Sequence, residues 1–340
     1  MSITAKELAK ILNLSEAAIS MALNNKPGVS TQTRKKVIAT AKEYGYDFSK
    51  LAETEHETVS NGSIYFLLYR RHGAVVSDTP FFSQLSEGIE AGCRSAHYHM
   101  NLYYLYETDD IEAQLKEIIR LGCKGIILLG TEIQEADFKP FSKLPVPLVL
   151  LDSYFENYTT DCVLINNVQG AYLATQYLIA NCKTQPGYLH SSYHIQNFME
   201  RADGFYKAIR TSGMSTSRSI VHKLTPSVEG AYADMLALIQ SKEPLADAYF
   251  ADNDLIAAGA IRALRECGYR IPKDISIVGF DDMPLCTYVE PPLTTVRVPK
   301  QYMGEIAVKR LVELIETRNP APLKITVETE LVKRGSTPYS

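Results

Sequence analysis

Acidic and amide side chains follow several apolar runs in this 340-residue chain. Asp152 ends the run PLVLLD, Asp252-Asn253-Asp254 follows DAYFA, and Asp281-Asp282 follows ISIVGF. Such acids also serve as helix N-caps, and a helix starting at Leu255 needs a cap, so we interpret Asp252 and Asp254 as caps. Met283-Pro284 begins no obvious helix after Asp281, which favours a ligand-binding role for that carboxylate.

The spacing of these side chains does not predict an enzyme. The sequence holds no G-x-G-x-x-G, G-x-x-x-x-G-K-[ST], G-x-S-x-G or H-E-x-x-H motif. Asp281 and Asp282 are adjacent and would point to opposite sides of an extended chain, which argues against an acid/base pair. His97 and His99 have no third ligand nearby, so we interpret them as exposed strand-edge residues and expect neither a metal nor another cofactor.

Strand-like apolar runs alternate with helical patterns from Ser63 onward, which predicts two α/β sandwiches of similar size with parallel sheets. Ligands of such sheets bind beyond the carboxyl ends of the strands, where the acids above lie. The expected strands are SIYFLLY, NLYYLY, GIILLG, PLVLLD, CVLIN, PGYLH, SIVHKL, DAYFA and ISIVGF, and the expected helices lie around 82–95, 111–121, 132–141, 170–179, 200–211, 229–241 and 255–267.

Three short amphipathic helices are predicted before these sandwiches, between residues 3 and 46. Thr4-x-x-Glu7 is a capping box for the first, and Ser15 and Ser30 are N-caps for the second and third. Helical periodicity alone fits any three-helix bundle, but an exposed helix face can also enter the major groove of DNA. The second helix would bury Ala18, Ile19, Ala22 and Leu23 and expose Glu16, Ala17, Ser20, Met21 and Asn24, and the third would turn Val37, Ile38, Ala41 and Tyr44 inward.

The charge distribution favours contact with DNA at one end of the chain. The formal net charge is only −4, but residues 1–50 hold seven Lys and one Arg against four acids and so carry about +4, which leaves about −8 for the rest. A basic head on an acidic body suits a protein that touches phosphate with one end only.

Particular sequence motifs identify a family. Near the start they are Leu8-Ala9, Leu14-Ser15, Ile19-Ser20, Leu23-Asn24, Val29-Ser30-x-x-Thr33-Arg34 and Gly45-Tyr46; further on they are Pro80-Phe81-Phe82, Arg201-x-x-Gly204-Phe205, Phe250-Ala251-Asp252-Asn253-Asp254, Val278-Gly279-Phe280-Asp281-Asp282 and Pro292-Leu293-Thr294-Thr295-Val296. Together they resemble the lactose/galactose repressor (LacI/GalR) family of transcription regulators. The resemblance implies a helix-turn-helix domain joined to a two-lobed effector domain like a periplasmic sugar-binding protein, with the chain crossing between the lobes three times.

The resemblance also implies which residues bind an effector in the cleft between the lobes. Asp281 could accept two vicinal hydroxyls, an arginine and an asparagine could donate, and an aromatic ring could cover the apolar face of a sugar. A sugar is therefore the expected effector, with a nucleoside as the alternative. The residues implied are Phe81 and Phe82 from the first lobe, Asp152 near the floor, and Arg201, Asn253 and Asp281 from the second lobe.

DNA contacts are expected from the first three helices. Met21 stands where many relatives carry Arg, so Met21 and Ala17 are expected to pack on thymine methyl groups, and polar neighbours to contact bases or phosphates. The expected DNA-binding residues are Thr4, Lys6, Ser15, Glu16, Ala17, Ser20, Met21, Asn24, Lys26, Thr31 and Thr33.

Residues 47–62, DFSKLAETEHETVSNG, are polar and aperiodic and form the expected linker. In the family this stretch is a hinge helix that inserts a leucine into the minor groove, but here Glu55 takes the place expected for the leucine. Carboxylates are repelled by a narrow, strongly negative groove. We therefore expect this hinge to insert weakly or not at all.

The remaining composition is that of a cytoplasmic protein. The six cysteines show no C-x-x-C spacing, which predicts reduced, mostly buried thiols. No signal peptide is evident, and the longest apolar runs have the length of strands, far short of a membrane span.

The sequence thus predicts a transcription regulator, with repression as the favoured role, that binds a near-palindromic operator in double-stranded DNA as a homodimer under effector control. The alternative is an intracellular sugar-binding protein with weakened DNA binding. The expected domains are residues 1–46 for DNA binding, 47–62 for the linker and 63–340 for effector binding and dimerisation, with 63–160 and 291–319 in the first lobe and 161–290 and 320–340 in the second.

Overall fold

The computed structural model describes residues 3–23, 28–48, 60–73, 75–76, 80–317 and 320–338. The chain divides into two compact units, residues 1–60 and 61–340. Within the described ranges, no helix combines the length and the apolar character needed to cross a bilayer.

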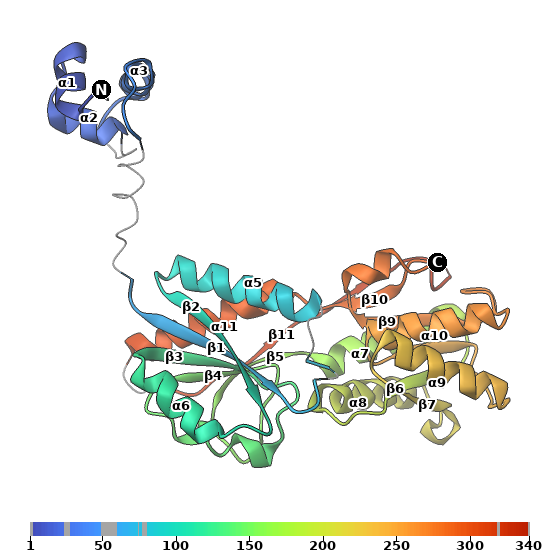
Figure 1. The fold of residues 1–340 in the computed structure, drawn as a ribbon. Helices are drawn as coiled ribbons and strands as arrows, with labels where there is room; N and C mark the ends of the chain where they lie inside the picture. Colours follow the sequence, from blue (N-terminus) through green and yellow to red (C-terminus); the bar gives the residue numbers. More distant parts are fainter. Residues whose placement is uncertain are drawn as a thin grey trace. The chain divides into compact units, whose positions relative to one another are not determined.

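The described part of the first unit contains three helices, α1 (Ala5–Leu12), α2 (Glu16–Leu23) and α3 (Thr31–Glu43) (Figure 1). Each begins after the predicted cap. Thr4 Oγ1 accepts a hydrogen bond from Glu7 N at 3.3 Å, and Ser15 Oγ and Ser30 Oγ each accept one at 3.1 Å, from Ala18 N and Thr33 N. The core shared by the three helices contains Leu8, Ala9, Ile19, Ala22, Val37 and Ala41.

The end of α3 differs from the prediction. Tyr44, expected to point inward, is 50% exposed. It is the C-cap residue of α3, so the helical spacing on which the prediction rested ends there. Tyr46 and Phe48 pack against the core instead.

Two six-stranded sheets form the second unit, one in each lobe, and all nine predicted strands are present. Among the described strands, every pairing is parallel except that between β10 and β12. In sheet order the first lobe contains β11 (Lys324–Val327), β5 (Asp161–Ile165), β4 (Leu148–Leu151), β3 (Cys123–Leu129), β1 (Ser63–Arg70) and β2 (His99–Tyr106). The second contains β12 (Glu330–Val332), β10 (Thr294–Arg297), β9 (Ser276–Asp281), β8 (Ala248–Ala251), β6 (Gly187–Ser191) and β7 (Val221–Leu224).

Helices cover both faces of each sheet (Figure 1). Alternate residues of β1 point to opposite faces of the sheet. Phe66 packs in the apolar cluster that contains residues of α5 and α11, and Leu67 packs in the cluster that contains residues of α6. The helices of the first lobe are α5 (Pro80–Ser95), α6 (Ile111–Arg120) and α11 (Lys300–Glu316). Those of the second are α7 (Asn167–Cys182), α8 (Gln196–Thr211), α9 (Val228–Gln240) and α10 (Asp254–Glu266).

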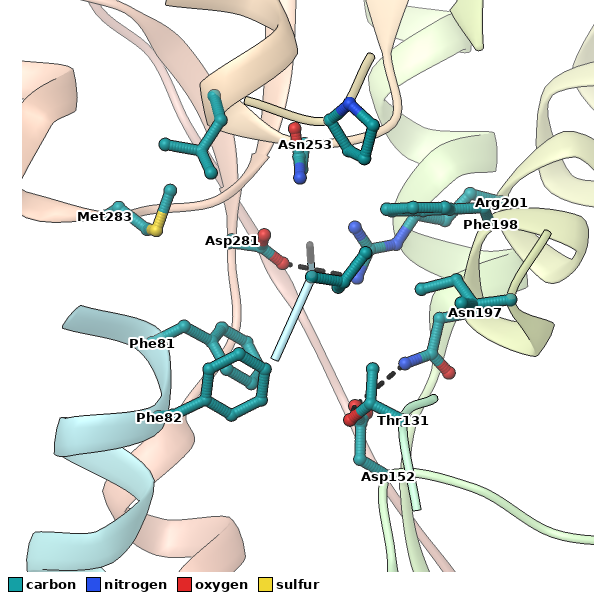
Figure 2. Close-up of a pocket in the computed structure, with 14 residues that line it drawn as sticks. Phe81, Phe82, Thr131, Asp152, Asn197, Phe198, Arg201, Asn253, Asp281 and Met283 are labelled. Atoms are coloured by element: carbon teal, nitrogen blue, oxygen red, sulfur yellow. Dashed lines mark hydrogen bonds and ion pairs between the residues drawn. The ribbon is translucent and has the colours of Figure 1, made fainter. Parts of the chain in front are cut away.

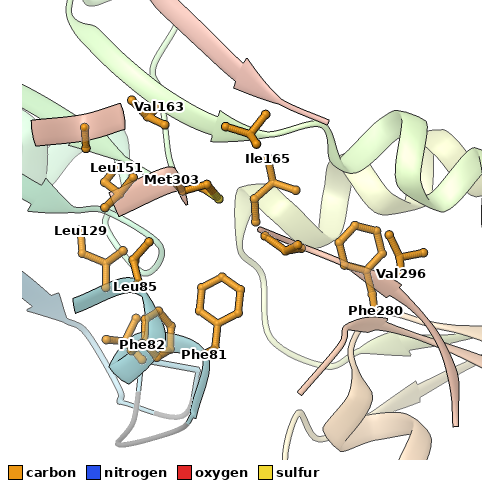
Figure 3. Packing of buried hydrophobic residues seen from close by; sticks show 14 of the residues in the cluster. Phe81, Phe82, Leu85, Leu129, Leu151, Val163, Ile165, Phe280, Val296 and Met303 are labelled. Carbon is orange, nitrogen blue, oxygen red and sulfur yellow. The ribbon is translucent and has the colours of Figure 1, made fainter. Parts of the chain in front are cut away.

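The α5 and α11 helices lie very close together in the first lobe. A Cβ atom added at Gly88 of α5 would be 2.0 Å from the backbone oxygen of Gln301 in α11. The apolar cluster beneath these helices continues into the second lobe, from Phe82 through Ile165 to Phe280 (Figure 3). This continuity means that the two lobes share one core where the chain crosses between them.

The predicted lobe boundaries are wrong by one strand at each crossing. Strand β5 was assigned to the second lobe but pairs with β4 and β11 in the first. Strand β10 was assigned to the first lobe but pairs with β9 in the second, and β11 was assigned to the second but lies in the first. An apolar run predicts a strand but does not specify its partner, so pairing decided these boundaries.

The helix expected around residues 132–141 is also wrong. Two short 3₁₀ helices are found there, η1 (Glu135–Phe138) and η2 (Phe141–Lys143). Pro140 lies between them, and a proline inside a longer helix would remove a backbone donor and clash with the preceding turn.

Candidate functional site

A pocket lies between the two lobes, beyond the carboxyl ends of their strands (Figure 2). It contains all six residues that the resemblance implied. Its lining residues are Val75, Phe81, Phe82, Thr131, Asp152, Ile195, Asn197, Phe198, Arg201, Pro226, Asn253, Leu255, Asp281 and Met283. We call this site the inner pocket.

One wall of the inner pocket is aromatic. Phe81 and Phe82 lie in the first turn of α5, and their ring centroids are 5.0 Å apart with the rings edge to face. Both rings face the cavity from the first lobe (Figure 2). They offer apolar surface to the ring of a ligand.

Arg201 of α8 is held rigidly on the opposite side. Its Nε donates to Asn167 Oδ1 at 2.9 Å, its Nη1 to the Asp252 carbonyl oxygen and its Nη2 to Asp281 Oδ1 at 3.2 Å. Its guanidinium carbon also lies 3.8 Å from the centroid of the Phe280 ring. The cation is therefore buried, oriented and paired before any ligand arrives.

Asp152 has an unsatisfied oxygen in the pocket. Its Oδ2 accepts hydrogen bonds from Thr131 Oγ1 at 2.6 Å and from Asn197 Nδ2 at 2.9 Å, and the second bond joins the two lobes. Its Oδ1 is buried and has no hydrogen-bond partner among the described residues. Burial raises the pKa of this carboxyl to about 7.

Asp281 is the second buried acid of the inner pocket. Burial raises its pKa, while the neighbouring Arg201 and Lys300 charges act in the opposite direction. Asp282 turns away and accepts from Arg297 Nε at 2.7 Å and Arg334 Nη2 at 2.6 Å. The two adjacent carboxylates therefore have different partners and do not act as a pair.

The prediction that Asp252 and Asp254 cap α10 is wrong. The N-cap is Asn253, whose Oδ1 accepts from Ile256 N at 2.9 Å. Asp252 instead accepts from Ser191 N at 2.6 Å, and Asp254 accepts from Met283 N at 2.8 Å. The two acids tie neighbouring strand ends together, and Asn253 both begins α10 and lines the inner pocket.

Several pocket residues were not predicted. Thr131 follows the end of β3 by two positions, so the rule that selected Asp152 could have found it. Asn197 and Met283 carry no comparable signal. Asn197 lies in helix α8, and Met283 follows the Asp281-Asp282 pair. Their contribution depends on where α8 and β9 meet the opposite lobe.

A buried carboxylate orders the loop beside the pocket. Glu132 Oε2 accepts backbone hydrogen bonds from Arg71, His72 and Gly73 at 2.9, 3.2 and 3.0 Å, and its Oε1 accepts from Val75 and Val76 at 2.9 and 2.8 Å. Burial alone would raise its pKa, but these donors outweigh burial and lower it. Glu132 is therefore ionised, and its hydrogen bonds hold the backbone of the loop that places Val75 in the lining of the inner pocket.

Part of the predicted DNA-reading face of α2 has the expected exposure. Glu16, Ala17 and Ser20 are exposed, but Met21, which was also expected to be exposed, is half-buried. Ser15 caps α2, the Thr4 hydroxyl donates to Glu7 at 2.7 Å, and Thr33 Oγ1 is 2.8 Å from Ser30 Oγ. Lys6 is exposed, while Asn24, Lys26, the Thr31 side chain and most of the linker lie outside what the structure describes.

Two further predictions concern histidine and cysteine. His97 and His99 are exposed beside the edge strand β2, and no cluster of three metal-ligating side chains occurs in the described ranges. The six cysteines are free thiols, of which Cys267 is exposed and Cys182 is half-buried.

Comparison with known proteins agrees with this architecture. Residues 175–337 match the model of the periplasmic binding protein-like domain. The chain is 31% identical to the transcriptional regulator GalS of Salmonella typhimurium, over 90% of this chain and 88% of GalS. It is 28% identical to the transcriptional repressor PurR of Mannheimia succiniciproducens, over 98% of both chains.

A solved structure extends the agreement to three dimensions. A LacI family transcriptional regulator from Enterococcus faecium with bound ribose is 26% identical, with a TM-score of 0.69 over 80% of this chain and 98% of that chain. The identity to GalS over most of both chains, together with this fold, places the chain in the LacI/GalR family of transcription regulators.

Proposed function

We propose that this protein is a transcription repressor whose DNA binding is controlled by a sugar held in the inner pocket. The observation that carries the sugar assignment is the buried Asp152 carboxyl, whose Oδ1 has no partner in the described ranges and lies in the same pocket as Arg201 and Asp281. These groups accept from and donate to hydroxyls, and Phe81 and Phe82 offer apolar surface. A ring with hydroxyls on its edge and an apolar face matches that combination.

A nucleoside is the second candidate effector. The adjacent rings of Phe81 and Phe82 could also stack on a purine base. The LacI family structure from Enterococcus faecium, which holds ribose, favours the sugar.

DNA binding is assigned to the exposed face of α2. Ala17 and Met21 would contact base edges, and Lys6 and Ser20 would contact phosphate. One recognition helix reads few bases, so a homodimer on a near-palindromic operator in the cytoplasm is proposed. The other proposed DNA contacts are Thr4, Ser15, Glu16, Asn24, Lys26, Thr31 and Thr33.

The edge strand β2 supports the homodimer. It lies at the end of the first sheet and exposes large side chains, with Leu102 44%, Tyr103 39% and Tyr106 46% accessible. An unpaired edge offers backbone donors and acceptors, and aromatic residues are enriched at interfaces. A second copy of the chain would cover this edge through a two-fold contact.

Control of DNA binding would arise from unequal affinity of the effector for two arrangements of the lobes. Asp152 and Asn197 already join the lobes across the inner pocket at 2.9 Å. A ligand that uses the free Asp152 oxygen and Arg201 would contact both lobes at once. The resulting change in lobe angle would reach the DNA-binding heads through the linker.

The acidic linker is proposed to contribute little to DNA affinity. Glu55 stands at the position expected for the inserted leucine, so Glu55→Lys should raise operator affinity by removing repulsion from phosphate. A clear loss of affinity in that variant would contradict this proposal.

The DNA assignment is tested by selecting duplexes from a random pool with the purified full chain at near-physiological salt. The expected result is a two-fold symmetric motif whose binding weakens steeply with added salt. Ala17→Glu should abolish enrichment, because it places a carboxylate on the proposed face of α2. Ala39→Glu, the same change at an exposed site on α3, should retain it. Failure to enrich any motif, with the chain folded and sugars present, would favour the alternative of a sugar-binding protein with weakened DNA binding.

The effector assignment is tested by calorimetric titration with neutral sugars and purine nucleosides. A sugar that binds the wild type should bind Asp152→Asn at least about tenfold more weakly, a loss of about 1.4 kcal/mol. Binding of a nucleoside but of no sugar would overturn the sugar assignment.

A further inference from the structure

A second cavity, open to solvent, adjoins the inner pocket. The two cavities share Thr131 and Ile195 in their linings. We call the second cavity the outer chamber. It is lined by Thr131, Glu132, Ile133, Gln134, Glu135, Tyr154, Phe155, Glu156, His194, Ile195 and Gln196.

The outer chamber, like the inner pocket, is built by both lobes. The segments after β3 and β4 supply residues 131–135 and 154–156 from the first lobe, and the segment that leads into α8 supplies 194–196 from the second. Tyr154 of the first lobe lies close to α8 of the second, since burial and the neighbouring Glu200 carboxylate of α8 raise the pKa of the Tyr154 hydroxyl. Because both lobes line the chamber, a ligand that extended into it from the inner pocket would still lie between the lobes.

The charged residues that line the chamber are all acidic. Three of its lining residues are Glu132, Glu135 and Glu156, and none of the described lining residues is Lys or Arg. Glu132 is ionised because five backbone N–H groups bind its two oxygens. Glu135 and Glu156 are exposed at the rim. A phosphate placed here would meet these carboxylates, while Lys324, whose Nζ lies 3.0 Å from the centroid of the Tyr154 ring, is not among the lining residues.

The uncharged groups of the chamber suit hydroxyls. Gln134, Gln196, His194 and Tyr154 supply side-chain donors and acceptors. Phe155 and Ile195 supply apolar surface beside them. Polar side chains outnumber apolar ones in this lining, which suits a second unit rich in hydroxyls.

We propose that the outer chamber is a second effector subsite, which holds an uncharged or positively charged second unit and rejects phosphate. This inference rests on the proposed binding of a sugar in the inner pocket. It narrows the effector class to disaccharides and amine-bearing glycosides in preference to monosaccharides and sugar phosphates. Hydrogen bonds to the second unit favour disaccharides, and the negative charge of the chamber repels sugar phosphates.

The test is calorimetric titration of the full chain with matched probes. The probes are glucose, galactose and ribose, the disaccharides maltose, lactose and cellobiose, glucosamine, and the 1- and 6-phosphates of glucose and galactose. We expect at least one disaccharide to bind about tenfold more tightly than its component sugars, and every phosphate to bind at least about tenfold more weakly than the parent sugar.

A charge-reversal variant separates the chamber from the inner pocket. Glu135→Lys combined with Glu156→Lys changes two exposed rim residues and should raise the affinity for sugar phosphates at least about tenfold without altering that for the free monosaccharides. Glu243→Lys combined with Glu316→Lys makes the same change in net charge at exposed sites elsewhere and should alter neither.

Three results would overturn the inference: equal binding of a disaccharide and its components, equal binding of a phosphate and its parent sugar by the wild type, or an unchanged phosphate affinity in the charge-reversal variant. In these cases monosaccharide binding that is lost in Asp152→Asn would leave the proposed sugar site intact. If no sugar of any size binds, the proposed sugar effector fails, and the second subsite fails with it.

Discussion

The carboxylate of Glu132 provides a quantitative test of how the loop beside the inner pocket is ordered. Glu132→Gln removes the charge and leaves one oxygen to serve five backbone donors. Each hydrogen bond to a charged group contributes about 1.5 to 3 kcal/mol, but desolvation of the buried carboxylate offsets much of that sum. The amide NH2 that replaces one oxygen leaves at least two of these donors unsatisfied, at about 1 to 3 kcal/mol each, which gives a net loss of about 2 to 6 kcal/mol in the free energy of unfolding.

The pH dependence has a definite sign. The pKa of Glu132 is lowered in the folded protein, so its contribution to stability is fully present above the ordinary glutamate pKa of about 4.3 and is lost as the pH falls through the folded pKa. The difference in stability between wild type and Glu132→Gln should therefore be constant from about pH 6 to 8 and shrink in acid.

The assay is urea denaturation of the full chain followed by circular dichroism, since the sequence contains no Trp. Hydrogen exchange should also show faster exchange of the amides at Arg71, Gly73 and Val76 in the variant. Glu135→Gln, three residues along and exposed, is the matched control and should change stability by less than about 0.5 kcal/mol. A loss below about 1 kcal/mol with unchanged exchange of those amides would refute the reasoning.

Three further changes test other parts of the molecule. The pKa of the buried Asp152 carboxyl is raised to about 7 in the folded protein, so as the pH rises towards that value the unfolded chain ionises first and the wild type loses stability. Asp152→Asn should therefore be more stable than wild type at pH 8, and by less at pH 5, when both are melted. Ser30→Ala removes the cap of α3 and should cost about 1 kcal/mol, seen as a lower melting temperature of the N-terminal unit and weaker DNA binding, whereas unchanged melting would contradict it. Gly88→Ala places a Cβ against Gln301 and should cost about 2 to 3 kcal/mol in chemical denaturation, and a neutral effect would show that α5 and α11 can separate freely.

Local features of the sequence determined much of the fold. The starts of α1, α2 and α3 were predicted from Thr4, Ser15 and Ser30, because an N-cap bonds to backbone only three residues away. The nine strands were predicted because a buried parallel strand needs a continuous apolar run. Asp152 and Asp281 were selected because strand ends in such sheets face ligands, and both line the inner pocket.

Relations between residues far apart in sequence were decided by the tertiary structure. Strand pairing, which apolar runs do not encode, moved β5, β10 and β11 to the lobes opposite those predicted. Asp252 and Asp254 accept hydrogen bonds from backbone N–H groups at other strand ends, and Asn253 is the residue that caps α10.

The chemistry of the inner pocket shows the same division. The sequence by itself determined that a carboxylate would stand at residue 152. Only the packing of the lobes brought Thr131 and Asn197 to one of its oxygens, from 21 and 45 positions away in the chain, and left the other oxygen open. A buried carboxyl takes its pKa and its ligand preference from such neighbours, and those neighbours exist only when two lobes meet.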